Sequence, residues 1–173
     1  MGNFDYTLRN TDEYSQLPYR SGVGALIINK NYQVFVAKRV DSKHDVWQMP
    51  QGGMNVGETP SAAVMREIKE EIGTDHCELI LESNHWYSYD VPQKITKRLW
   101  SGQYRGQKQK WFLVKFLGRN SDININTLVP EFCEWRWVEI DNLLSIVIPF
   151  KRKLYRNILN EFHFEITKLK MDK

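Results

Sequence analysis

A chain of 173 residues is long enough for one well-packed domain and short for two. Its 42% hydrophobic and 26% charged content is ordinary for a soluble globular protein, and it lacks an apolar run of about 18 residues, so we expect no membrane span. The two cysteines, Cys77 and Cys133, are too few for a disulfide framework or a thiolate metal cluster, which favours a reducing cytoplasm.

Charge is distributed unevenly along the chain, whose net charge is +3. Residues 91–121 contain no Asp or Glu but carry eight Lys or Arg, so the remainder has a net charge of about −5. Trp100, Tyr104 and Trp111 lie among these basic residues, a composition that favours phosphates and stacked bases of RNA. The alternative is that Trp111 belongs to the core and that the lysines serve solubility.

The first half of the chain predicts a polar arm, a hairpin and one short helix. Residues 1–17 are expected to form a loosely ordered arm, and residues 18–173 a single domain. Residues 23–28 and 33–39 are apolar strand candidates separated by the turn-forming Asn29-Lys30-Asn31. A polar loop at residues 41–45 follows.

The second half predicts strands, one long loop and a C-terminal helix. We expect strands at residues 77–82, 85–89, 110–117 and 134–139, a basic loop at 92–109, a helical turn at 141–144 and a long helix from about residue 150. The apolar side chains of that helix recur at helical spacing at Leu154, Ile158, Phe162, Ile166 and Leu169. The mixture of strands and helices indicates one α/β domain.

The short helix has clear end signals. Thr59 is suited to cap its N-terminus, Pro60 occupies the first helical position, and Gly73 can adopt the left-handed conformation that ends a helix. Glycine-rich residues 50–57 precede it.

Three carboxylates gather near the C-terminal end of this helix. The spacing of Glu67, Glu70 and Glu71 places them on one face, opposite Ile68 and Ile72. Met65 is expected on that apolar side as well. The helix dipole and mutual repulsion both disfavour the acids here. A solvated acidic face is the alternative, but a bound divalent cation would remove both penalties, and oxygen-only ligands favour Mg²⁺, with Mn²⁺ as the second choice.

The order and spacing of these residues resemble the Nudix box. Gly52, Glu58 and the run Arg66-Glu67-Ile68-Lys69-Glu70-Glu71-Ile72-Gly73 match its charged and glycine positions across residues 52–74. Thr74 departs from it, because the family has an aliphatic residue at that packing position. The resemblance implies a Nudix-type α/β/α sandwich with a mixed sheet, and hydrolysis of phosphoanhydride bonds.

The resemblance also implies roles for individual residues. Glu67, Glu70 and Glu71 would be catalytic metal ligands, and the backbone carbonyl of Gly52 would add a further ligand. One of the three acids, with Glu67 as the first choice, would also act as the general base. Glu58 and Arg66 are expected to form a structural pair that joins the loop to the helix.

Segments outside the box resemble one subgroup, the bacterial RNA 5′-pyrophosphohydrolases related to dinucleoside polyphosphate hydrolases. These segments are Tyr19-Arg20 and residues 47–53, 106–112, 130–132, 135–137 and 150–152. The subgroup has a polar His-Ser pair where this chain has Asp45-Val46.

The subgroup resemblance implies further site residues. Glu131 would supply a fourth carboxylate to the metal ions. Arg20 and Arg39 would grip the 5′ phosphates and stack on a terminal base, for which a planar guanidinium is suited. The pocket for the first nucleotides would be lined by Gln107, Phe150 and Lys151.

Three functions are compatible with these residues. The first choice is a Mg²⁺-dependent hydrolase that removes pyrophosphate from the 5′-triphosphate end of RNA, leaves a 5′-monophosphate and initiates mRNA decay. The second is the same chemistry on dinucleoside polyphosphates such as diadenosine pentaphosphate. The third, a non-catalytic nucleotide or RNA sensor, is disfavoured because all three box carboxylates are intact. We expect an RNA 5′ end or a nucleotide as partner, no DNA and no membrane; no segment identifies an activating protein.

Overall fold

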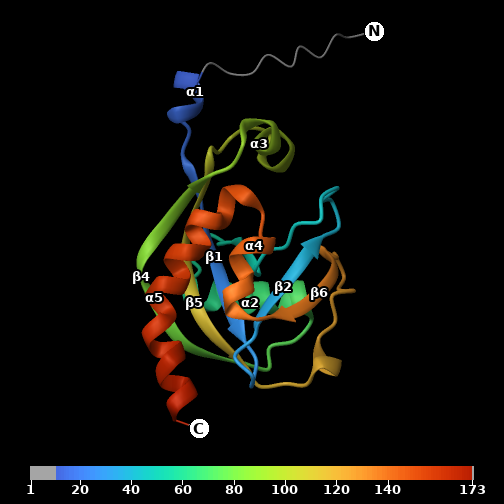
Figure 1. The fold of residues 1–173 in the computed structure, drawn as a ribbon. Coiled ribbons are helices and arrows are strands. Elements are labelled where there is room, and N and C mark those ends of the chain that lie inside the picture. The colour runs from blue at the N-terminus through green and yellow to red at the C-terminus, as the bar shows by residue number, and fades with distance from the viewer. Residues whose placement is uncertain (1–10, 173) are drawn as a thin grey trace.

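Figure 1 shows the computed structural model, which describes residues 11–172. The strands are β1 (Tyr19–Ile28), β2 (Val34–Arg39), β3 (Gln51–Gly53), β4 (Cys77–Asp90), β5 (Gly106–Phe116) and β6 (Phe132–Val138). The α-helices are α1 (Thr11–Ser15), α2 (Pro60–Ile72), α3 (Gln93–Trp100), α4 (Ile140–Ile146) and α5 (Arg152–Met171), with single 3₁₀ turns at Asn120–Asp122 and Pro149–Lys151.

The strands form one mixed sheet in the order β4-β5-β1-β2-β6, and β3 pairs with β1 off this path. β1 and β5 are parallel, from Tyr19 opposite Gly106 to Ile28 opposite Lys115, whereas the other pairings are antiparallel. The predicted hairpin is confirmed, because β1 and β2 pair with Ile28 opposite Val34.

Helices cover both faces of the sheet. Alternate residues of β1 point to opposite faces, so Val23 and Ile27 pack with Ile68 of α2, while Leu26 packs with Ile158 of α5. Because β1 is buried on both sides, it reads as a continuous apolar run instead of an alternating one. The expected α/β/α sandwich with a mixed sheet is confirmed (Figure 1).

The predicted arm differs from the structure over its last residues. Residues 1–10 of that prediction lie outside the described part of the chain, but Thr11–Ser15 form helix α1. The hydroxyl of Tyr14 donates to the backbone oxygens of Val91 and Arg105, and the Arg105 guanidinium donates to the Ser15 oxygen at 2.7 Å. These contacts tie α1 to the ends of β4 and β5, so the expectation of a loose arm is wrong for residues 11–15.

Two other predictions between residues 77 and 116 are corrected. The two expected strands at 77–82 and 85–89 are one strand, β4, whose pairing with β5 shifts register between Glu82 and Trp86. The polar Ser83-Asn84 pair lies within this irregular stretch of the strand. The expected loop at 92–109 contains helix α3 and the first residues of β5. Helix α3 lies at the same end of the sheet as α1 (Figure 1).

The remaining predictions hold with shifted bounds. The predicted strand at 134–139 corresponds to β6, and the predicted helical turn and C-terminal helix correspond to α4 and α5. All five apolar residues assigned to the inner face of the last helix contribute to one core cluster. None of the helices within residues 11–172 has the length and hydropathy that a bilayer crossing requires.

Trp111 occupies the centre of the sheet and requires a glycine beside it. Its side chain is fully buried, and it lies opposite Gly24 in the parallel β1–β5 pair. A Cβ on residue 24 would lie 2.4 Å from atoms of the indole ring, well inside van der Waals contact. The backbone approach between these strands therefore depends on Gly24 having no side chain.

We predict that Gly24→Ala destabilises the protein by about 1–3 kcal/mol, because the added methyl overpacks the core. Urea unfolding followed by tryptophan fluorescence measures this change. The double variant Gly24→Ala/Trp111→Leu is the matched control, in which the extra penalty of the alanine should largely disappear. An alanine variant as stable as the wild type would contradict the steric account.

Candidate active site

Helix α2 has the end structures that its sequence predicts. The Thr59 hydroxyl accepts a hydrogen bond from the Ala62 backbone N–H at 3.3 Å, and Pro60 is the first helical residue. Gly73 has a φ of 75°, in the left-handed region, and its N–H donates to the Lys69 oxygen at 3.0 Å. These caps fix where the helix ends and hence where its last-turn carboxylates lie.

The orientation of α2 separates the three carboxylates. Glu67 and Glu71 are buried toward the sheet on the same side as Ile68 and Ile72, whereas Glu70 is exposed. The expectation that all three acids lie opposite the apolar residues is therefore wrong for Glu67 and Glu71. The i, i+4 pair is turned inward because β3 lies directly beneath it.

Gly52 in β3 makes room for the Glu67 carboxyl group. A Cβ on residue 52 would lie 1.9 Å from the Glu67 carboxyl carbon, so any other residue would displace this side chain. β3 pairs with β1 through Val23 opposite Gly52. This pairing fixes how closely the Glu67 carboxyl group packs against the sheet. Glycine at this position is thus a steric requirement of the site.

Glu71 is the most deeply buried acid, with 1% of its surface exposed. Its Oε2 accepts a hydrogen bond from the Gln51 backbone N–H at 3.1 Å, but its Oε1 has no hydrogen-bond partner among the described residues. Burial, followed by the charges of Glu131 and Glu67, raises the pKa of Glu71 well above its ordinary value. A buried acceptor without a donor is costly, and a cation would relieve that cost.

Arg66 connects the loop before the helix to its carboxylates. Its guanidinium donates to both oxygens of Glu58 at 2.8 Å, to the Gly53 oxygen at 2.8 Å, to Glu67 at 2.8 Å and to Glu70 at 3.1 Å. The predicted Glu58–Arg66 pair is confirmed. The Arg66 hydrogen bond, with backbone contact at Asn55, lowers the pKa of Glu58 to about 2.

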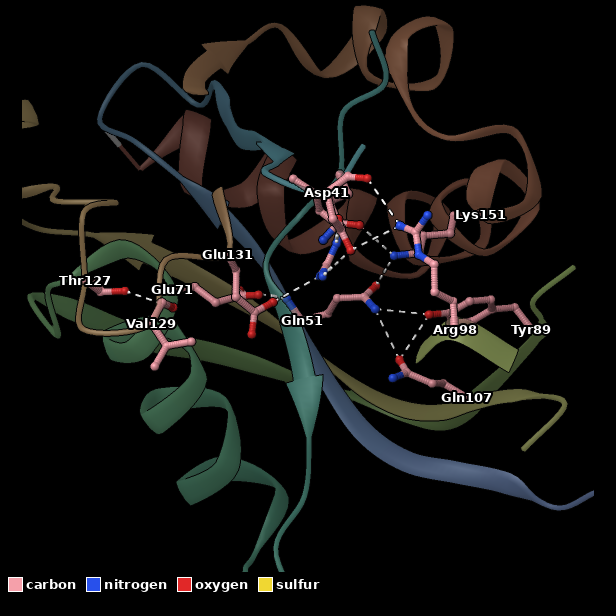
Figure 2. A network of polar contacts seen from close by, with 12 residues as sticks. Asp41, Gln51, Glu71, Tyr89, Arg98, Gln107, Thr127, Val129, Glu131 and Lys151 are labelled. Carbon is pink, nitrogen blue, oxygen red and sulfur yellow. Dashed lines mark hydrogen bonds and ion pairs between the residues drawn. The ribbon is translucent and has the colours of Figure 1, made fainter. Parts of the chain in front are cut away.

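Glu131 approaches the same cluster from the segment before β6. Its Oε2 accepts from Arg39 at 3.0 Å, and Arg39 also donates to Asp41 at 2.8 Å. Figure 2 shows Glu131 and Asp41 in the same network of polar contacts as Gln51. Arg98 of α3 reaches the Asp41 carboxylate at 3.6 Å. Desolvation raises the pKa of Glu67, and the nearby charge of Glu131 adds to that rise, so Glu131 belongs to the same acidic field.

These donors are suited to a hard divalent cation. All are oxygens, two of the acids are buried, and one carboxylate oxygen of Glu71 has no donor among the described residues. As the side chains stand within residues 11–172, no three His, Cys, Asp or Glu groups converge to enclose an ion, and Arg66 and Arg39 are paired with the acids instead. The roles of Gly52, Glu67, Glu70, Glu71 and Glu131 as metal ligands therefore stay predictions.

A second polar cluster adjoins the acids on the α5 side. The Lys151 ammonium is buried and donates to Gln48 Oε1 at 2.9 Å. It also donates to Gln51 Oε1 at 2.9 Å (Figure 2). Desolvation, together with the charge of Arg39, lowers the pKa of Lys151 to about 7. Gln51 joins the two clusters, because its backbone bonds Glu71 while its side chain bonds Lys151.

The predicted nucleotide pocket residues lie around this lysine. Gln107 accepts from the Tyr89 hydroxyl at 3.0 Å, and the Tyr89 ring stacks on Phe150 with centroids 6.2 Å apart. The structure thus brings Gln107, Phe150 and Lys151 together. Sequence reasoning missed Tyr89 as a member, although its place in the aromatic alternation of β4 was visible.

Arg20 and Trp111 are two further residues for which the sequence predicted contacts with RNA. A Cβ on Gly53 would lie 2.3 Å from Arg20 Nη2, so the guanidinium lies over β3 next to Gly52. Within the described chain the Arg20 guanidinium makes no hydrogen bond or ion pair, although the Arg20 backbone pairs with β5. Trp111, in contrast, is fully buried and is not available to stack on a base.

Comparisons with known proteins agree with this arrangement. A family model described as NUDIX domain matches residues 18–158. An RNA pyrophosphohydrolase of Rickettsia conorii (strain ATCC VR-613 / Malish 7) is 58% identical over 88% of this chain and 95% of that protein. The RNA pyrophosphohydrolase of Rickettsia prowazekii (strain Madrid E) is 57% identical over 90% and 97%.

Solved structures show the same fold at low identity. The E. coli dihydroneopterin triphosphate pyrophosphohydrolase has a TM-score of 0.62 and 19% identity, with 80% of this chain and 94% of that chain covered. A C. elegans Ap4A hydrolase has a TM-score of 0.56 and 19% identity, with 79% and 94% covered. At these identities the likeness concerns the fold alone.

The lowered pKa of Lys151 makes stability depend on pH. Between pH 7 and 10.5 the unfolded chain holds a proton on this lysine that the folded chain releases, so stability should rise with pH across that window. Below pH 7 both states are protonated and the full cost of burying the charge remains. We predict that wild type gains on the order of 1 kcal/mol per pH unit relative to Lys151→Met above pH 7.

Urea unfolding at pH 6.5, 8 and 9 measures the difference between the two proteins. The exposed Lys153→Met is the control and should follow the wild type at every pH. A constant difference between wild type and Lys151→Met would contradict the prediction.

Proposed function

Because this chain belongs to the NUDIX family of hydrolases, we propose that it removes pyrophosphate from the 5′-triphosphate end of RNA, leaving a 5′-monophosphate. The observation that carries the proposal is identity of 57–58% with RNA pyrophosphohydrolases over nearly their whole length, joined to an intact acidic cluster. In a cell this reaction would initiate mRNA decay. A cytoplasmic location fits it and the two free cysteines.

The site has groups of both signs that such a substrate needs. Among residues 11–172 the Arg20 guanidinium has no hydrogen-bond or ion-pair partner, and it lies beside the strand that holds Gly52, so it would be available to take a terminal phosphate. Arg39 would add a second contact by exchanging part of its pairing with Asp41 and Glu131. The Tyr89–Phe150 stack offers an aromatic wall for a base next to Gln107 and Lys151.

We propose that the divalent metal is Mg²⁺, with Mn²⁺ as a substitute, held by Glu67, Glu70, Glu71, Glu131 and the Gly52 carbonyl. Such an ion supplies two things to phosphoanhydride hydrolysis: charge neutralisation on the phosphates and a lowered pKa of water. The chain's own part is to hold the acids in place through Arg66 and Gly52. We assign the role of general base to Glu67, whose carboxylate Arg66 orients.

Turnover of 5′-triphosphate RNA tests the proposal. We predict that Glu67→Gln and Glu71→Gln each lower pyrophosphate release in Mg²⁺ at least about a hundredfold, because each removes a charged oxygen from the proposed metal ligands. Chelation by EDTA should abolish release in the wild type, and added Mn²⁺ should restore it. Chromatographic quantification of released pyrophosphate and of 5′-monophosphate RNA provides the readout.

Glu78→Gln is the matched control, because Glu78 is an exposed acid on β4, outside the cluster. It should retain wild-type rates. The same preparation is offered diadenosine pentaphosphate in competition with RNA; a strong preference for the dinucleotide would replace the proposed substrate while keeping the chemistry. RNA binding without any release would instead support a non-catalytic sensor.

A further inference from the structure

Three side chains on one face of β5 form a buried polar line beneath the proposed nucleotide pocket. Gln107, Gln109 and Trp111 alternate along the strand, so all three point to the same side of the sheet. Their exposed fractions are 4%, 0% and 0%. A row of buried amides needs its hydrogen bonds satisfied, and the direction of each bond decides which end of each amide faces outward.

One end of the line fixes that direction without ambiguity. The Trp111 indole N–H can only donate, and it donates to Gln109 Oε1 at 3.1 Å. The Gln109 amide is thereby set with its oxygen toward Trp111 and its Nε2 toward Gln107, where it donates to Oε1 at 2.5 Å. The Trp111 indole ring, at the start of this row of hydrogen bonds, packs against Gly24.

The other side of Gln107 imposes the same direction. Lys151 donates to Gln51 Oε1, so the Gln51 Nε2 faces away from the lysine and donates to Gln107 Oε1 at 3.2 Å and to the Tyr89 hydroxyl at 3.0 Å. Tyr89 donates to the same Gln107 oxygen. Three donors therefore meet one oxygen, and turning the amide over would place its N–H₂ against two other N–H₂ groups.

We propose that Gln109 and Trp111 are positioning residues that lock the Gln107 amide with its Nε2 N–H₂ toward the substrate. Nε2 makes no hydrogen bond to any residue in the described range 11–172, and it is not fully enclosed. Gln107 then donates a hydrogen bond from Nε2 to its ligand, so the matching group on the nucleotide is a hydrogen-bond acceptor. The direction of the Trp111–Gln109 hydrogen bond does not change with pH, because the indole N–H does not titrate.

This inference rests on the proposed function only in that Gln107 faces a nucleotide, and one arm of its test needs no substrate. Side-chain amide signals of ¹⁵N-labelled free protein are assigned with Gln107→Met and Gln109→Met. The Gln109 N–H₂ should exchange with solvent about tenfold or more slowly than the Gln107 N–H₂, since only the former is a hydrogen-bonded donor. Slower exchange at Gln107 would overturn the proposed polarity.

The second arm is a double-mutant cycle on kcat/KM for 5′-triphosphate RNA. Gln109→Met should lower kcat/KM about fivefold, mainly through a higher KM, which corresponds to the loss of one hydrogen bond. In the Gln107→Met background the same change should cost less than about twofold, because Gln109 acts through Gln107. Equal losses in both backgrounds would overturn the positioning role and leave a structural one.

Trp111→Phe gives an independent reading if Gln109→Met folds poorly. It removes the indole N–H and keeps an aromatic ring, and it should raise KM only where Gln107 is present. The exposed Gln16→Met serves as control and should match wild type in both backgrounds. If RNA is not turned over at all, the proposed function fails, while the exchange experiment still decides the polarity of Gln107.

Discussion

The rest of the site depends on one constraint: the carboxyl groups of Glu67 and Glu71 are packed between helix α2 and the sheet. Gly52 of β3 leaves the space for the Glu67 carboxyl group. Two acids of like charge are taken out of water together, so each raises the cost of ionising the other. Arg66 offsets part of that cost for Glu67, but within residues 11–172 no group donates to one oxygen of Glu71. The fold tolerates this arrangement because the caps of α2 and the pairing of β3 with β1 leave the acids no other position.

Gln51 joins the acids to the residues of the proposed nucleotide pocket. Gln51 bonds Glu71 through its backbone N–H, and Lys151 and Gln107 through its side chain (Figure 2). A displacement of Glu71 would therefore also displace the hydrogen-bond partner of Lys151 and Gln107. Under the proposed function, this connection would place the scissile phosphates and the first base against one hydrogen-bonded frame. Specificity and chemistry then share the same supporting hydrogen bonds.

Local rules were sufficient for some features and not for others. The caps at Thr59 and Gly73 depend on neighbours along the chain, so spacing predicts them, and the resemblance supplied the equally local Glu58–Arg66 pair. The inward turn of Glu71 depends on where the sheet lies, which helical periodicity does not contain. The burial of Lys151 arises where Gln48, β3, β4 and the turn before α5 meet, and no pattern within one segment signals it. The site acids were named from a resemblance, whereas their pairing with Arg39 and Arg66 came only from the structure.

The parallel pairing of β1 with β5 has a consequence for biosynthesis. The strand that begins at residue 19 has as its central neighbour a strand that ends at residue 116, so the middle of the sheet joins segments far apart in the chain. A ribosome must release about two thirds of the polypeptide before this pair can close, and until then the apolar β1–β2 hairpin has no partner for its open edge. During that period the exposed edge of the hairpin is open to pairing with other chains.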